Sequence, residues 1–178
     1  MTKRLLISAF LICACTTLSA QVYLRSNLLG LVMVVPNAGL EFGLSDHSTV
    51  LVEGYYSPIW NQEDFKAKGF MITPEYRYYF CQSFNGHYIG AHGNYARYTD
   101  LKTRSKAPIR DGHAFSAGLT YGHTWKFDHH WLLDMYVGAG WVRMESDITA
   151  DGRYEAEQDK IENKFSLTRL GISFGYRF

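Results

Sequence analysis

The C-terminal residues 169–178, RLGISFGYRF, alternate between two kinds of side chain. The even-numbered positions, from Leu170 to Phe178, are large and apolar or aromatic, whereas the odd-numbered positions are small or basic. Successive side chains of a β-strand point to opposite faces, so this period of two predicts a strand with one apolar face. The direction in which that face turns decides what kind of protein the chain can be.

The same period recurs along the chain. Turn or loop signals separate eight alternating segments, expected near 22–32, 37–45, 49–57, 69–80, 87–98, 113–127, 131–144 and 165–178. The 13 Tyr, 11 Phe, 4 Trp and 16 Gly residues suit strands and tight turns. Each segment is at least about as long as the ~9–11 residues that a tilted strand needs to cross a bilayer.

The connections between these segments alternate in length. The short connections are SDHS, CQSFNG and DHH, and the long, charged ones are PIWNQEDFKAK, TDLKTRSKAPIRDG and ESDITADGRYEAEQDKIEN. The first connection, VVPN, is the exception, because it is short although it lies at the same end as the long connections. This alternation is typical of a barrel inserted into a membrane from one side. The sequence therefore predicts an all-β fold, an eight-stranded antiparallel up-and-down transmembrane β-barrel. Its last strand should close against its first, because a free edge is not tolerated in hydrocarbon.

Pro74 conflicts with the fourth strand, because proline cannot donate a ladder hydrogen bond. We expect a β-bulge at Thr73–Glu75 to accommodate it. A break in the strand at this point would put the strand count in doubt.

The face opposite the apolar one carries acidic and basic residues in equal number. We expect these residues to form an ion-pair network that fills a narrow lumen: Arg25, Glu41, Glu53, Glu75, Arg77, Asp134, Arg169 and Arg177. A selective pore would instead leave one sign of charge in excess. Aromatic residues at both ends of the strands indicate that the apolar face is turned toward lipid. The alternative is a soluble, lipocalin-like ligand-binding barrel, with the rings packed inside and the charges outside.

The first twenty residues form a separate unit. Lys3 and Arg4 precede a short apolar run, and small residues lead up to Gln21. This layout predicts a signal peptide over 1–20 and a mature barrel over 21–178; a lipoprotein cut before Cys15 fits the lipobox pattern poorly. Only Cys81 remains in the mature chain, which excludes an internal disulfide. The net charge of +1, without a basic stripe, argues against nucleic acid as a partner.

No catalytic residue, metal site or cofactor is predicted. The seven histidines have no spacing that gathers three metal ligands on one face. A lipid-modifying, acylase-type enzyme is the alternative considered, because Asp111, His113 and Ser116 are close in sequence. The period of two places His113 and Ser116 on opposite faces, so we expect a protein that is not an enzyme. Its long loops are expected either to bind a surface partner or simply to be solvated.

Two resemblances support this interpretation. The ending GISFGYRF resembles the terminal signal of Gram-negative outer-membrane proteins, which implies that Tyr176 and Phe178 are recognised by the barrel assembly machinery. The chain after residue 20 resembles small barrels of the OmpX and OmpA membrane-domain type. PNAGLEFG and PEYRYYFCQSFNGHYIGAHGNYARY resemble an uncharacterised family of such barrels more closely. The resemblance implies placement in the cell outer membrane, in contact with its lipid, and implies no activity.

Overall fold

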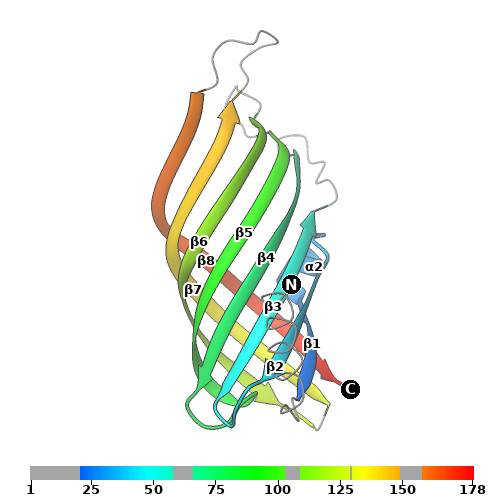
Figure 1. Cartoon of the computed structure of the whole chain (residues 1–178). Helices are drawn as coiled ribbons and strands as arrows, with labels where there is room; N and C mark the ends of the chain where they lie inside the picture. The colour runs from blue at the N-terminus through cyan, green and yellow to red at the C-terminus, as the bar shows by residue number, and fades with distance from the viewer. Residues whose placement is uncertain (1–20, 58–65, 103–108, 129, 149–157) are drawn as a thin grey trace, which may run out of the picture.

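The computed structural model describes residues 21–57, 66–102, 109–128, 130–148 and 158–178, so the expected signal peptide lies outside the described residues. Within these ranges eight strands form one closed barrel in chain order (Figure 1). The strands are β1 (Val22–Asn27), β2 (Asn37–Gly43), β3 (Ser48–Ser57), β4 (Lys66–Tyr79), β5 (Gly86–Lys102), β6 (Ile109–Lys126), β7 (Trp131–Ile148) and β8 (Gln158–Arg177). Each strand pairs antiparallel with its neighbours, which confirms the predicted all-β, eight-stranded, up-and-down barrel.

The last strand closes the barrel against the first, as predicted. Tyr23 pairs with Arg177 and Asn27 pairs with Ser173. We call the rim that carries the short β2–β3, β4–β5 and β6–β7 connections the turn end, and the opposite rim the loop end. At the loop end β7 and β8 extend well beyond β1, β2 and β3 (Figure 1). The strands β4 to β8 take up parts of the segments that the sequence assigns to long loops.

The first predicted strand, 22–32, is wrong in its second half. The strand ends at Asn27, and a short helix, α2 (Leu28–Val32), follows. The Asn27 side chain accepts a hydrogen bond from the backbone N–H of Leu29 at 3.0 Å, which is the bonding of a helix N-cap. Residues 28–35 are apolar without alternation, and such a run does not distinguish a strand from a helix.

The bulge expected at Thr73–Glu75 is also wrong. Pairing between β4 and β5 passes from Ile72↔Tyr95 to Glu75↔His92 in an unchanged register. The ladder skips Thr73 and Pro74, and the Thr73 hydroxyl donates instead to Asn94 Oδ1 in β5, 2.7 Å away. A side-chain hydrogen bond therefore bridges the gap that the proline leaves in the ladder.

A bulge does occur between β7 and β8. Gly138 pairs with Arg169 and the next residue, Ala139, pairs with Leu167, so Thr168 is an extra residue in β8. Such an insertion lets two consecutive side chains share one face of the strand. The Thr168 and Arg169 side chains both contact inward-facing groups, while Leu167 remains 58% exposed on the outside.

The two surfaces of the barrel differ sharply in chemistry. The outer surface exposes rings near both rims: Tyr56, Phe70, Tyr95, Phe115, Trp141 and Phe165 toward the loop end, and Phe80, Trp125, Phe127, Trp131 and Phe178 toward the turn end. Leu40, Val52, Leu119 and Val137 are among the exposed aliphatic residues between them. The buried side chains inside the barrel are mostly polar or charged. The apolar face of each strand therefore turns outward.

Candidate functional site: the charged lumen

Seven of the eight residues predicted for the lumen network are buried inside the barrel. They are Arg25, Glu41, Glu53, Glu75, Arg77, Asp134 and Arg169. The period of two within each strand sets their direction, and the strand register sets which of them meet. Three bases and four acids are thereby brought together from six strands.

The network has a lower part toward the turn end. Arg25 in β1 contacts Glu41 in β2 and Asp134 in β7, with 2.6 Å from Arg25 Nη1 to Asp134 Oδ2. Arg77 Nη1 in β4 lies 2.9 Å from the same Asp134 oxygen and 3.5 Å from Glu41 Oε2. Two arginines and two carboxylates thus bridge four strands across the barrel.

The upper part is centred on Arg169 in β8. This residue contacts Glu53 in β3, and its Nη1 lies 2.8 Å from Glu75 Oε2 in β4. Arg77 Nε lies 2.7 Å from that same Glu75 oxygen. Glu75 therefore joins the two parts into one continuous network.

Neutral side chains complete the network. Hydroxyl groups donate to its carboxylates: Thr49 and Tyr79 to Glu41, at 2.5 and 3.1 Å, Tyr88 and Thr124 to Asp134, at 3.2 Å each, and Tyr55 to Glu53, at 3.3 Å. Because the buried acids outnumber the buried bases by one, these donors help to satisfy the additional negative charge.

Aromatic rings flank two of the arginines. The Arg77 guanidinium lies 4.5 Å from the centre of the Tyr88 ring, and that of Arg169 lies 4.8 Å from the centre of the Tyr136 ring. Both distances suit cation–π contacts, which are stronger where water is excluded.

An apolar plug closes the lumen below the network, and it was not predicted from the sequence. Tyr23, Phe84 and Leu132 form a fully buried cluster, with 4.7 Å between the centres of the Tyr23 and Phe84 rings. Phe84 belongs to the β4–β5 connection and has a φ of 64°, which turns the chain so that its ring enters the barrel. A left-handed phenylalanine is uncommon, and nothing in CQSFNG signals one.

Uncharged polar residues lie above the network. His92 contacts the Thr120 hydroxyl through Nδ1 and the Thr168 hydroxyl through Nε2, each at 2.8 Å. Asn94 donates to the Ser116 hydroxyl at 2.7 Å. His92 therefore lies inside the barrel, and it reaches Thr168 because the β8 bulge turns that residue inward.

The eighth predicted residue, Arg177, lies apart from the other seven. It is only partly buried, at the turn end of β8, where it pairs with Tyr23 across the closing seam. Its neighbours Tyr176 and Phe178 are on the outer surface. The Tyr176 ring lies 4.7 Å from the Trp131 ring and 5.3 Å from the Phe178 ring, centre to centre.

His113 and Ser116 point to opposite faces, as the alternation predicts. His113 lies 2.9 Å from Glu145 on the outer side, whereas Ser116 bonds to Asn94 inside. Among the residues that the structure describes, no three His, Cys, Asp or Glu side chains gather where they could hold a metal ion. Over the same ranges, no helix is long and apolar enough to cross a membrane.

The fold and the lumen together define a closed eight-stranded antiparallel β-barrel with charged residues buried inside. A family model described as "Protein of unknown function (DUF3575)" matches residues 5–178, so the chain belongs to this family. No curated protein matches the chain.

Proposed function

We propose that this protein is an outer-membrane β-barrel of a Gram-negative bacterium, of the small OmpX and OmpA membrane-domain type. Its lumen is filled and does not conduct, so its role is structural or lies in surface interaction through the loop end. The observation that carries this proposal is the opposite chemistry of the two surfaces, with seven charged side chains buried inside and rings and aliphatic side chains exposed outside.

The outer surface has the dimensions of a membrane-spanning band. Along β7 the outward side chains run from Trp131 through Met135 and Val137 to Trp141. The distance between the two tryptophans corresponds to the ~9–11 residues of a tilted spanning strand. Amphipathic rings favour the two interfaces of a bilayer, and aliphatic side chains favour the hydrocarbon between them.

A soluble lipocalin-like barrel fits these surfaces poorly. Such a barrel would need an apolar interior to bind an apolar ligand, and polar residues on its outer surface. Here the interior holds an ion-pair network, while Phe165, Leu119 and Phe178 are 77%, 72% and 83% exposed. Exposed apolar surface of this extent is expected where lipid covers it.

The lumen fits a plug better than a pore. Its bases and acids contact one another directly across the barrel, and the Tyr23–Phe84–Leu132 cluster closes the turn end below them. An ion would have to displace paired charges and then pass a cluster of apolar side chains. Both steps oppose conduction.

Two parts of the proposal concern partners. The loop-end connections 58–65, 103–108 and 149–157 lie outside the described residues, and a surface partner would meet the barrel at that rim. At the turn end, the partly buried Tyr176 and the exposed Phe178 are the proposed signal for the barrel assembly machinery. This assignment rests on the resemblance of the final strand to the terminal signal of Gram-negative outer-membrane proteins.

Conductance in a planar lipid bilayer tests the proposed plug. We expect the purified protein to insert and show no stable conductance steps. A variant with Glu75→Ala and Arg169→Ala, which removes the centre of the network, should show more frequent or larger current events. Large, stable, ion-selective steps from the unaltered protein would show an open lumen and contradict the proposal.

A role without catalysis is also part of the proposal, and lipid analysis tests it. The purified protein is incubated with lipid A and phospholipids, and the products are examined by mass spectrometry. We expect no transferred or released acyl chain. An acyl product that disappears in either a His113→Ala or a Ser116→Ala variant would establish the acylase alternative.

A further inference from the structure

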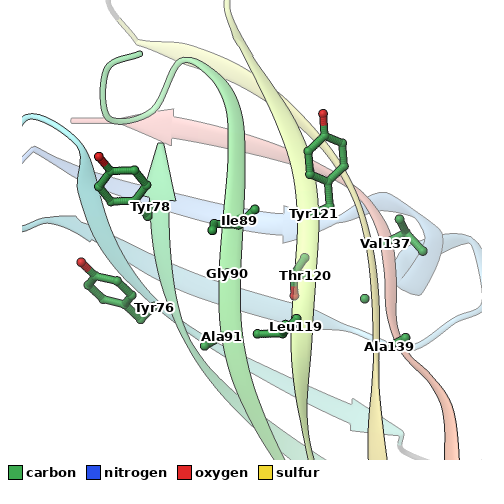
Figure 2. A pocket seen from close by; sticks show the side chains of 11 residues that line it. Tyr76, Tyr78, Ile89, Gly90, Ala91, Leu119, Thr120, Tyr121, Val137 and Ala139 are labelled. Carbon is green, nitrogen blue, oxygen red and sulfur yellow. The ribbon is translucent and has the colours of Figure 1, made fainter. Parts of the chain in front are cut away.

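A hollow lies on the outer wall of the barrel, across β4, β5, β6 and β7 (Figure 2). It is a cavity of 460 Å³, formed over two neighbouring rows of outward side chains. The row nearer the turn end is Tyr78, Ile89, Tyr121 and Val137, and the row nearer the loop end is Tyr76, Ala91, Leu119 and Ala139; the members of each row are paired in register. Its volume falls within the ~300–1,000 Å³ that is typical of ligand pockets.

Differences in side-chain size create the hollow. Ala91 and Ala139 reach only a short way from the sheet, and Gly90 and Gly138 line the cavity with backbone. The neighbouring Leu119 stands out from these small residues and is 72% exposed. The wall is therefore recessed at the two alanines, on either side of the projecting Leu119, instead of being smoothly convex.

The hollow has one polar end. The ring hydroxyls of Tyr76, Tyr78 and Tyr121 all point toward the end at which β4 turns into β5 (Figure 2). The Tyr121 hydroxyl also bonds with His87 Nδ1 at 2.8 Å, one row nearer the turn end. Tyrosine keeps its ring in an apolar layer and extends its hydroxyl toward water or headgroups. An occupant of the hollow would thus meet polar groups at the turn end and apolar ones elsewhere.

We infer that the hollow binds one acyl chain of a phospholipid from the leaflet at the turn end. This inference rests on the proposed function, because only a membrane-inserted barrel has hydrocarbon at this wall. The ester and headgroup region would lie at the Tyr78 and Tyr121 hydroxyls, and the chain would extend over Ala91 toward Ala139. A flexible chain with a single polar end matches both the shape and the polarity of the hollow. A second copy fits less well, because two convex barrels touch along a line and leave a recess unfilled.

The test compares alanine-to-leucine variants in lipid vesicles. The double variant Ala91→Leu with Ala139→Leu fills the hollow. Ala117→Leu is the matched control, because Ala117 is exposed on the same outer face but does not line the cavity. The probe is a phosphatidylethanolamine with a nitroxide on one acyl chain, and electron paramagnetic resonance counts the motionally restricted lipids per barrel. We expect the double variant to restrict one lipid fewer than the unaltered protein, and the control to match the unaltered protein.

A second variant tests the polar end. Tyr121→Phe removes a hydroxyl and leaves the ring, so the affinity for the labelled lipid should fall about two- to tenfold, as for the loss of one hydrogen bond. Unlabelled phosphatidylethanolamine should displace the probe, whereas lipid A should not. Displacement by lipid A would overturn the assignment of the leaflet.

Other outcomes separate the ways in which the inference can fail. Equal lipid counts for the inserted double variant and the control would overturn the inference while leaving the membrane barrel intact. A dimer that the double variant abolishes would identify a second copy as the occupant. Failure of the unaltered protein to insert into vesicles would contradict the proposed function itself.

Discussion

Arg169 in β8 donates from Nη1 to Glu75 Oε2 in β4 at 2.8 Å, across the lumen and between residues 94 positions apart. The same oxygen accepts from Arg77 Nε at 2.7 Å. One carboxylate oxygen therefore holds two buried guanidinium groups. Loss of the Glu75 charge would therefore leave both Arg77 and Arg169 with one partner fewer inside the barrel.

Glu75→Gln should destabilise the barrel. The amide keeps the shape of the side chain but removes the charge that both arginines share, and the expected loss is about 3 kcal/mol in the free energy of unfolding. Urea titration of the refolded protein in lipid vesicles measures it. The control is Glu145→Gln, because Glu145 pairs with Arg143 on the partly exposed outer surface, where an ion pair contributes ~0–1 kcal/mol. Equal losses in the two variants would show that the lumen network is not stabilising.

Val137→Arg tests whether the apolar face of the strands is turned toward lipid. Val137 lies at the middle of the outward row between Trp131 and Trp141, so arginine there should cost about 2–4 kcal/mol in the same vesicle assay. Asn163→Arg is the control, because Asn163 is exposed toward the loop end of β8 and should cost ~0–1 kcal/mol. A tolerated arginine at position 137 would mean that water covers this wall.

Cys81 reports which rim faces the outside of the cell. It is exposed in the β4–β5 connection at the turn end. A membrane-impermeant maleimide applied to intact cells should therefore leave Cys81 unlabelled, and permeabilising the outer membrane should allow its labelling. In a Cys81→Ser background, Asn163→Cys at the loop end should react in intact cells. The reverse pattern would show that the barrel is inserted the other way round.

The direction of the side chains could be predicted from the sequence because it depends on the period of two alone. That period places Glu41, Glu53 and Arg77 on one face of their strands, and barrel closure brings that face together in the lumen. The individual pairs could not be predicted. They depend on the register between strands distant in sequence, and the β8 bulge that turns Thr168 inward beside Arg169 leaves no sign in FSLTRLG.

The missed elements have different physical causes. The run LLGLVMVV is apolar throughout, so the periodic signal is absent where β1 gives way to α2, and only the capping role of Asn27 separates the two. Pro74 is accommodated by a hydrogen bond from Thr73 to Asn94, a contact between two strands that one segment alone does not reveal. Phe84 enters the lumen through a backbone conformation that its residue type disfavours.

The central claim, that this chain is a barrel inserted in an outer membrane, is tested most directly by where the folded protein is found. Cells expressing it are fractionated, and the outer-membrane fraction is examined by gel electrophoresis in detergent before and after boiling. We expect the protein in that fraction, with the unboiled barrel migrating faster than the boiled, unfolded chain. A folded monomer that stays soluble without detergent, and that is absent from the outer-membrane fraction, would contradict it.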